Sequence, residues 1–200
     1  MKNIYLVFGI FSLGVLLTAC NNQEGYDEKN GPIVEYPEEL EELDNFEAYS
    51  LKPFGINALI YVPDATANIG ASTAPEMIHE TDGYQWDLYV GQNFHMTIED
   101  WGTDNAIKDH LTLLEDQNVY TIEFLKNEEN FAYYKAELKV KGKGGKDNVG
   151  VDHVTYHVIA QHKIDGINYI FKTNKDGHPK PITEFMAKSV KSVKPIVDPS

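Results

Sequence analysis

Arginine is absent from this chain of 200 residues, and cysteine occurs once, at Cys20. Without arginine the chain lacks the bidentate guanidinium group that usually reads phosphate or guanine. The 31 acidic residues outnumber the 17 lysines, and the resulting net charge of −14 repels a phosphate backbone. A single cysteine cannot form an internal disulfide or a multi-cysteine metal site. These absences set aside nucleic-acid binding and disulfide-stapled folds.

The first 20 residues are typical of an export signal rather than of a folded element. Lys2 gives the positive start, and an apolar run follows from Ile4 to Leu17. This run is shorter than the roughly 20 apolar residues that a membrane-spanning helix needs. It ends in an aliphatic residue, a hydroxylated one, a small one and the cysteine, which are Leu17, Thr18, Ala19 and Cys20.

This tetrapeptide resembles the lipobox of bacterial lipoprotein (type II) signal peptides, in which Leu17, Thr18 and Ala19 would be read by the processing machinery. The resemblance implies a diacylglycerol on Cys20, cleavage before it, and membrane attachment in the cell envelope. Two or more acyl chains hold a protein stably at a bilayer. Residues 1–19 are therefore expected to be a signal peptide and Cys20 the anchor. Asn21 in place of Asp is what the family usually shows for the outer membrane, with periplasmic and surface display both open.

Residues 20–47 are predicted to be a lipidated cysteine followed by an acidic tether. Ten acidic residues and one lysine occur between positions 21 and 47, a composition typical of a solvated spacer. Within it, residues 37–46 could form a short helix, because Leu40 and Leu43 would share a face. The folded domain is expected to span 48–200.

Alternating apolar residues predict strands in the domain, and apolar residues three or four positions apart predict helices. The chain is expected to be α+β, with a mostly antiparallel twisted sheet of about six to seven strands. The predicted strands are 56–62, 84–90, 94–98, 119–126, 131–140, 149–162 and 167–173, with a long loop over 64–81. An internal helix is expected from Thr103 or Asp104 to Gln117, and a C-terminal amphipathic helix over 181–194. This order resembles the Mog1/PsbP-like fold over most of 48–194, a family with binding and assembly roles more than catalysis.

Aromatic residues are the main candidates for ligand contacts or for the core. Tyr84 and Trp86 alternate in step with Leu88 and Val90, which favours burial. Trp101 stands at the end of a predicted strand, between Asp100 and Gly102, and is the aromatic residue we expect to be exposed and available for binding.

The histidine pattern argues against a metal site. His153 and His157 share a strand face, but at about 3.3 Å per residue they lie roughly 13 Å apart, too far to chelate one ion. His162 would face the opposite side, and we expect these histidines on solvent faces. His79 and Glu80 lack the second histidine of an HExxH motif and are placed in a loop. No metal or cofactor is predicted.

No catalytic residue stands out, and the chain is predicted not to be an enzyme. The acidic pair Glu99 and Asp100 has no supporting spacing for glycosidase chemistry. None of the serines lies in a GxSxG context.

Charge is unevenly distributed along the domain. Residues 48–134 carry 3 lysines against 14 acids, a net charge of −11, whereas residues 135–200 carry 12 lysines against 7 acids, a net charge of +5. The glycine-rich segment 141–148 is not a phosphate-binding Walker loop, since it lacks the first glycine and the serine or threonine of that motif. A basic edge could meet anionic headgroups of a membrane. Its possible binding residues are Lys139, Lys141, Lys143 and Lys146.

Three functions stay open on the sequence alone. The first is a non-catalytic envelope lipoprotein that binds an envelope protein partner. The second is a carrier of a small ligand or lipid, with a pocket between the sheet and the C-terminal helix. The third is a hydrolase of envelope polymers acting through Glu99, Asp100 or Asp104. The oligomeric state is left open.

Overall fold

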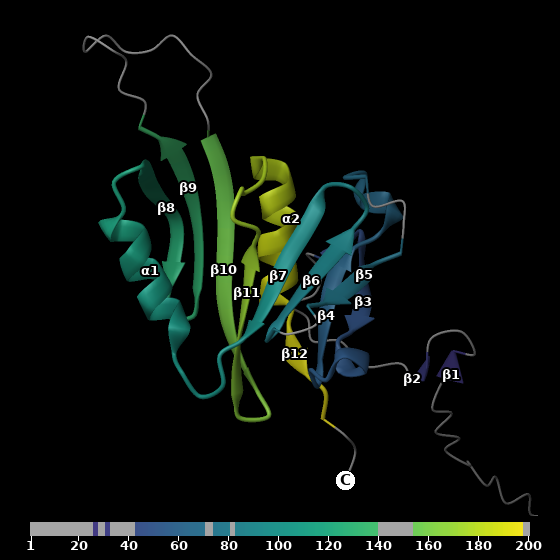
Figure 1. The fold of residues 1–200 in the computed structure, drawn as a ribbon. Helices are drawn as coiled ribbons and strands as arrows, with labels where there is room; N and C mark the ends of the chain where they lie inside the picture. Colours follow the sequence, from purple (N-terminus) through teal and green to yellow (C-terminus); the bar gives the residue numbers. More distant parts are fainter. Residues whose placement is uncertain are drawn as a thin grey trace, which may run out of the picture. The chain divides into compact units, whose positions relative to one another are not determined.

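An antiparallel sheet of seven strands forms the centre of the domain in this computed structural model (Figure 1). The structure describes residues 26–27, 31–32, 43–70, 74–80, 83–139 and 154–197. From edge to edge the strands are β5 (Glu76–His79), β6 (Gln85–Val90), β7 (Phe94–Asp100), β11 (Ile167–Thr173), β10 (Val154–Ile164), β9 (Phe131–Leu138) and β8 (Tyr120–Glu128). All neighbouring pairs are antiparallel, which confirms the predicted α+β class and the size of the sheet.

The chain divides into two compact units, Met1–Leu40 and Glu41–Ser200. In the first unit the described residues form β1 (Tyr26–Asp27) and β2 (Gly31–Pro32), which pair with each other. The signal-like segment and Cys20 lie outside the described residues. The second unit contains both described helices and the two larger sheets.

A second sheet of three strands was not expected from the sequence. Its order is β12 (Lys194–Pro195), β4 (Ala58–Pro63) and β3 (Phe46–Ser50). Strand β3 begins inside the segment predicted to be tether, so the boundary at residue 48 and the helical end of 37–46 are wrong. The reason is tertiary: β3 pairs with β4 along its whole length, and the Phe46 ring lies 5.5 Å from that of Phe185.

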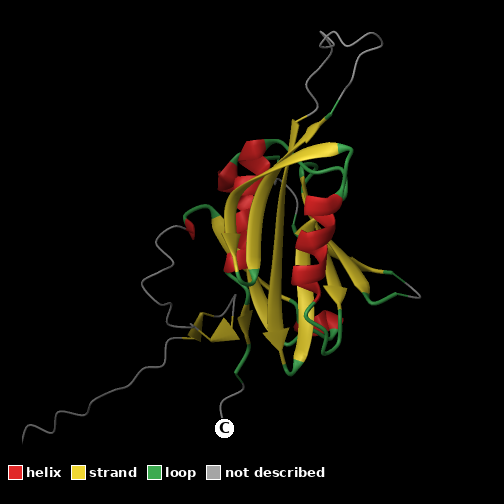
Figure 2. Ribbon diagram, turned by 90° about the vertical axis from the view of Figure 1, so that its left-hand side faces the viewer, coloured by secondary structure: helices red, strands yellow, loops and turns green. Residues whose placement is uncertain are grey.

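The two helices cover opposite faces of the seven-stranded sheet (Figure 2). Helix α1 (Ala106–Asp116) and helix α2 (Lys180–Lys191) correspond to the two predicted helices, with α2 ending three residues earlier than expected. The larger core lies between the sheet, α2 and the three-stranded sheet, where Ile60, Phe171 and Met186 are fully buried. The smaller core lies under α1 and consists of Ala106, Ile107, Ala132, Ile159 and Ile170.

Two local features complete the comparison with the predicted elements: one differs from its prediction and one confirms it. The predicted loop 64–81 contains the 3-10 turn η3 (Ala65–Ala67) and strand β5, which was missed because only Met77 of its four residues is buried. The predicted hairpin at Asp165 and Gly166 is confirmed, because both residues have positive φ angles, 50° and 89°.

Candidate functional site

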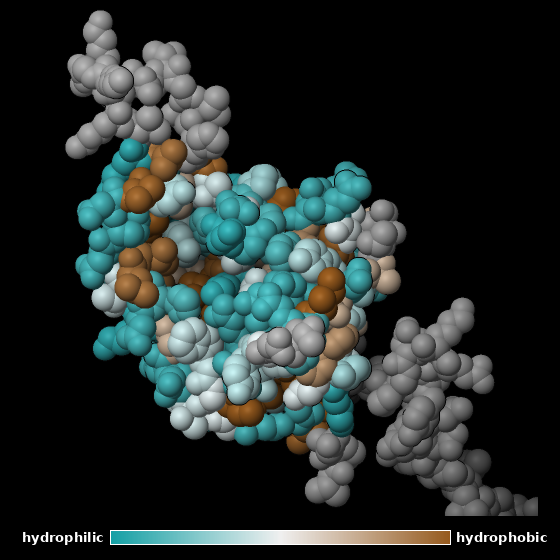
Figure 3. Space-filling model, in the orientation of Figure 1, coloured by the Kyte–Doolittle hydropathy of each residue, from teal (hydrophilic) through white to brown (hydrophobic). Residues whose placement is uncertain are grey.

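A pocket of about 660 Å³ lies between α1 and the sheet. Its walls come from the second half of α1, from β8, β9 and β10, and from the turn that follows β11. In the space-filling view a hollow lies beside apolar side chains on the part of the surface that α1 and β8 form (Figure 3). The volume is within the range of sites for small molecules.

One side of the pocket is apolar because β8 and β9 turn alternate residues toward α1. The pairs Ile122–Ala136 and Tyr120–Leu138 face each other across these strands. Leu113 and Leu114 of α1 complete this wall, together with Ile159 of β10. The Tyr134 ring stacks on the His157 ring at 5.0 Å and supplies an aromatic floor. This side suits a hydrocarbon or ring system.

The other side of the pocket is polar. It is lined by His110 of α1, by Lys172 of β11 and by the turn residues Asn174, Lys175 and Asp176. The Lys172 ammonium lies 2.7 Å from a Glu99 carboxylate oxygen, its one ion-pair partner among the described residues, and it has three N–H donors in all. A molecule with an apolar part and a polar part therefore matches the two sides.

His157 lies buried at the boundary between the two sides. Its nitrogens lie 3.0 Å from the Thr155 hydroxyl and 3.3 Å from the Thr173 hydroxyl. Burial lowers its pKa to about 4, and the nearby His178 adds to the effect, so the ring is neutral at pH 7. Gly177, at a φ of 68°, passes so close that a Cβ there would lie 2.5 Å from the ring. The turn after β11 is thereby fixed against the pocket floor.

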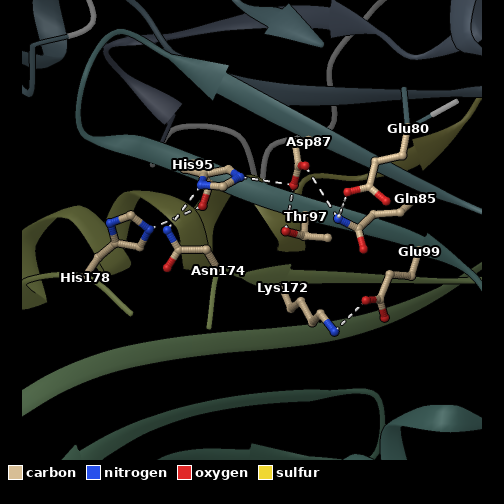
Figure 4. A network of polar contacts seen from close by, with 9 residues as sticks. All are labelled: Glu80, Gln85, Asp87, His95, Thr97, Glu99, Lys172, Asn174 and His178. Carbon is tan, nitrogen blue, oxygen red and sulfur yellow. Dashed lines mark hydrogen bonds and ion pairs between the residues drawn. The ribbon is translucent and has the colours of Figure 1, made fainter. Parts of the chain in front are cut away.

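A polar network continues from the pocket across the part of the sheet formed by β6 and β7 (Figure 4). Asp87 accepts hydrogen bonds from Thr97 (2.9 Å) and from His95 Nε2 (3.0 Å). The Asn174 amide donates to His95 Nδ1 (3.1 Å), and His178 Nε2 donates to the His95 carbonyl (3.3 Å). One His95 ring nitrogen thus donates and the other accepts within the network. The network joins the turn after β11 to strands β6 and β7.

Helix α1 is buried at its beginning and more exposed toward its end. The Gln161 side-chain oxygen accepts hydrogen bonds from the first amides of the helix, Ala106 (3.0 Å) and Ile107 (3.2 Å). These two residues are also the buried ones of α1, whereas Leu113 is 69% exposed. The second half of the helix thus covers the pocket without a continuous packed contact beneath it.

Trp101 is 40% exposed, as predicted. Its indole N–H donates to Glu99 (3.1 Å), and its ring meets His110 edge-on at 5.6 Å. Burial lowers the pKa of His110, with the nearby positive charge of Lys172 as the second cause. Trp101 therefore borders the polar side of the pocket through His110, although it does not line it.

The predicted lysine edge falls mostly outside the described residues, which include Lys139 but not Lys141, Lys143 or Lys146. Lys139 is exposed just after β9, and its amide donates to the Val119 carbonyl (2.9 Å). It follows Leu138, which lines the pocket. The possible role of these lysines stays a prediction.

Several expected exposures are wrong. His157 is buried, and His162 is half-buried with its Nε2 2.7 Å from the Val190 carbonyl, so neither lies on a solvent face. His79 ends a strand and stacks on Trp86 at 4.8 Å instead of lying in a loop. Tyr84 is 77% exposed because β6 begins after it, although Trp86, Leu88 and Val90 are buried as expected. Within the described ranges no three His, Cys, Asp or Glu side chains gather as metal ligands would.

Glu99 and Asp100, two of the three carboxylates considered for hydrolysis, have different partners. Glu99 is held by Lys172 and Trp101, and Asp100 accepts from the Gly102 amide at 2.7 Å. Successive residues of a strand point to opposite faces, which separates these two.

The pocket residues His110, Lys172 and Asn174 were not predicted as site residues. They come from a helix, a strand and a turn that are up to 64 residues apart, and no local motif links them. The pocket also lies under α1 rather than beside the C-terminal helix, where a ligand pocket was expected. Met186 and Val190 of α2 are fully buried and fill that position.

Comparisons with protein-family models, with curated proteins and with solved structures give no match to this chain. The resemblances to lipoprotein signal peptides and to the Mog1/PsbP-like fold stay predictions. Among the helices that the structure describes, none has the length and apolarity needed to cross a bilayer.

Proposed function

We propose that this chain is a lipid-anchored protein of the bacterial cell envelope whose domain binds a small amphipathic molecule, without catalysis, in the pocket under α1. The observation that carries the proposal is the two-sided pocket of about 660 Å³, apolar toward β8 and β9 and polar toward β11. The lipobox-like tetrapeptide Leu17–Cys20 supports the anchor.

Anchoring and ligand class support each other. A protein held by acyl chains on Cys20 stays within reach of a bilayer. Membranes are the main source of molecules that combine an apolar part with a polar one. Lys172 and Lys175 on the polar side offer donors to acceptor groups of such a molecule.

The first test is native mass spectrometry of the full chain after gentle purification in mild detergent. We expect a bound molecule of defined mass in addition to the polypeptide and its acyl chains. The second test is binding of the amphipathic dye 1-anilinonaphthalene-8-sulfonate. Ala136 lines the pocket from β9, so Ala136→Phe should fill the apolar side and weaken dye binding at least tenfold.

Thr112→Phe is the matched control, because Thr112 is exposed on α1 and does not line the pocket. It should leave dye binding unchanged, and both variants should keep a cooperative thermal transition. Bare polypeptide in the first test, together with equal dye binding by both variants, would contradict the proposal.

Binding of an envelope protein partner is the second candidate. It is favoured by two exposed apolar side chains, Leu113 on α1, which is 69% exposed, and Val119 just before β8, which is 56% exposed. Replacing both by Ser should reduce near-stoichiometric capture of a partner from mild-detergent envelopes. Ile78→Ser is the control, since Ile78 is 49% exposed on β5 at the other edge of the sheet.

A further inference from the structure

The two edges of the seven-stranded sheet differ in length and exposure. Strand β5 at one edge has four residues, whereas β8 at the other has nine, seven of them exposed. In the part of the chain that the structure describes, β8 pairs with β9 alone, so its outer side presents unpaired amide and carbonyl groups. A long exposed edge of this kind is a template for another strand.

A bulge in β8 places two residues of opposite charge at equivalent positions on either side of Phe124. The register with β9 shifts between Phe124 and Lys126, which leaves Leu125 as an extra residue. Glu123 is therefore opposite Lys135 and Lys126 is opposite Tyr133, two positions further along β9. Residues two positions apart in a ladder share a face and direct their backbone groups to the same side. Glu123 and Lys126 thus hold equivalent places on either side of Phe124.

This symmetry defines how a second β8 could pair. In an antiparallel pair with a two-fold axis at Phe124, the two Phe124 residues are opposite each other. Glu123 of each copy is then opposite Lys126 of the other copy, on the same face of the sheet. Further out, Thr121 is opposite Glu128 and Ile122 is opposite Asn127. Every pair joins residues whose backbone groups point to the same side, so the hydrogen-bond ladder can continue.

The neighbouring registers are unfavourable. Moving the axis to Glu123 would place two Glu123 carboxylates directly opposite each other, and moving it to Lys126 would do the same with two ammonium groups. Like charges directly opposite in a sheet are destabilising. An axis at Asn127 would also give opposite-charge pairs, Lys126 with Glu128, but the Lys191 ammonium already holds Glu128 at 2.9 Å. The Phe124 axis pairs Lys126 with Glu123 instead, whose neighbour Lys135 has Glu137 as its closer partner.

The side chains in question are available. Glu123 is exposed, with the Lys135 ammonium 3.5 Å away, and that lysine keeps Glu137 at 3.0 Å as its closer partner. Lys126 is exposed and forms no ion pair within the described ranges. The same pairing would cover Leu125, which is 39% exposed beside the axis.

We propose that this domain associates with a second copy of itself through antiparallel β8–β8 pairing about Phe124. The occupant of the edge is thus a strand of identical sequence, selected by the complementary charges of Glu123 and Lys126. Attachment of both copies to one membrane would raise their local concentration and favour the pair. This proposal does not depend on the ligand pocket.

The test is a charge-reversal series on the full chain in mild detergent, with the protein mass resolved from the detergent by light scattering. The wild type is expected to show twice the mass of one chain at high concentration. Lys126→Glu and Glu123→Lys should each raise the dissociation constant of the dimer about tenfold. The two-fold symmetry places each substitution in both Glu123–Lys126 contacts, so its effect occurs twice. The double variant Glu123→Lys, Lys126→Glu should restore wild-type association.

Lys163→Glu makes the same change of charge at an exposed position of β10 and should leave association unchanged. Far-UV circular dichroism shows whether each single variant is folded, and recovery in the double variant separates a lost contact from a damaged fold. A monomer at all concentrations would mean that the bulge and Lys126 protect the edge from pairing, and would overturn the proposal. A dimer indifferent to both single reversals would overturn it as well.

Discussion

Each face of the seven-stranded sheet is covered by one amphipathic helix, but only the face under α2 is closely packed. Helix α2 places Met186 and Val190, both fully buried, into a core shared with the three-stranded sheet. Helix α1 buries Ala106 and Ile107 at its beginning and leaves Leu113 exposed and a pocket beneath its second half. The comparison shows that the face of α2 is closely packed, whereas the face of α1 is packed only at the start of the helix and has a pocket beneath the rest.

Truncating one side chain on each helix should give the largest difference in stability between the two faces. Met186→Ala is expected to lower the free energy of unfolding by about 2–5 kcal/mol, because it leaves a cavity in a fully packed core. Leu113→Ala on α1 should cost less than about 0.5 kcal/mol, because that side chain is 69% exposed. Urea unfolding followed by circular dichroism measures both. Equal losses would show that α1 is packed as tightly as α2.

The pH dependence of stability should report on the buried histidine under α1. The pKa of His157 is lowered from 6.5 to about 4, so between these values the unfolded chain binds a proton that the folded chain does not. Its contribution to stability is complete above pH 6.5 and is lost as the pH falls, by roughly 3 kcal/mol at pH 4. His157→Gln should therefore flatten the decline between pH 6.5 and 4.

His162 gives the matching measurement on the face of α2. Burial lowers its pKa too, but the hydrogen bond to the Val190 carbonyl opposes the shift. His162→Gln should flatten the same decline less than His157→Gln does. Thermal unfolding at a series of pH values measures both slopes, and an unchanged slope in His157→Gln would refute the assignment.

A smaller effect than those of Met186 and His157 is expected at the attachment of α1. Gln161→Ala removes the acceptor of the Ala106 and Ile107 amides and should cost about 1 kcal/mol. Hydrogen exchange should quicken in α1 and not in α2. Gln161→Glu keeps an oxygen acceptor at the positive end of the helix and should retain protection. Faster exchange in both helices of Gln161→Ala would indicate a general loss of stability instead.

Periodicity predicted the elements that are long and half-buried. Strand β11 was expected at its observed limits, and the internal helix within three residues of them, because their apolar residues repeat regularly. Periodicity failed for β3, β5 and β12, which are short or edge strands with few buried residues. It also failed for Tyr84, since the alternation continues one step beyond the point where β6 begins.

By itself the sequence determined the α+β class and the exposure of Trp101, because each depends on residues close together in the chain. The lipobox-like anchor motif stays a prediction. Only the tertiary structure decided which helix packs closely against the sheet and which one covers a pocket. That outcome depends on contacts between distant segments, such as Gln161 with the start of α1 and Glu99 with Lys172. The pocket under α1 arises from a gap in packing, and a gap leaves no periodic signal in the sequence.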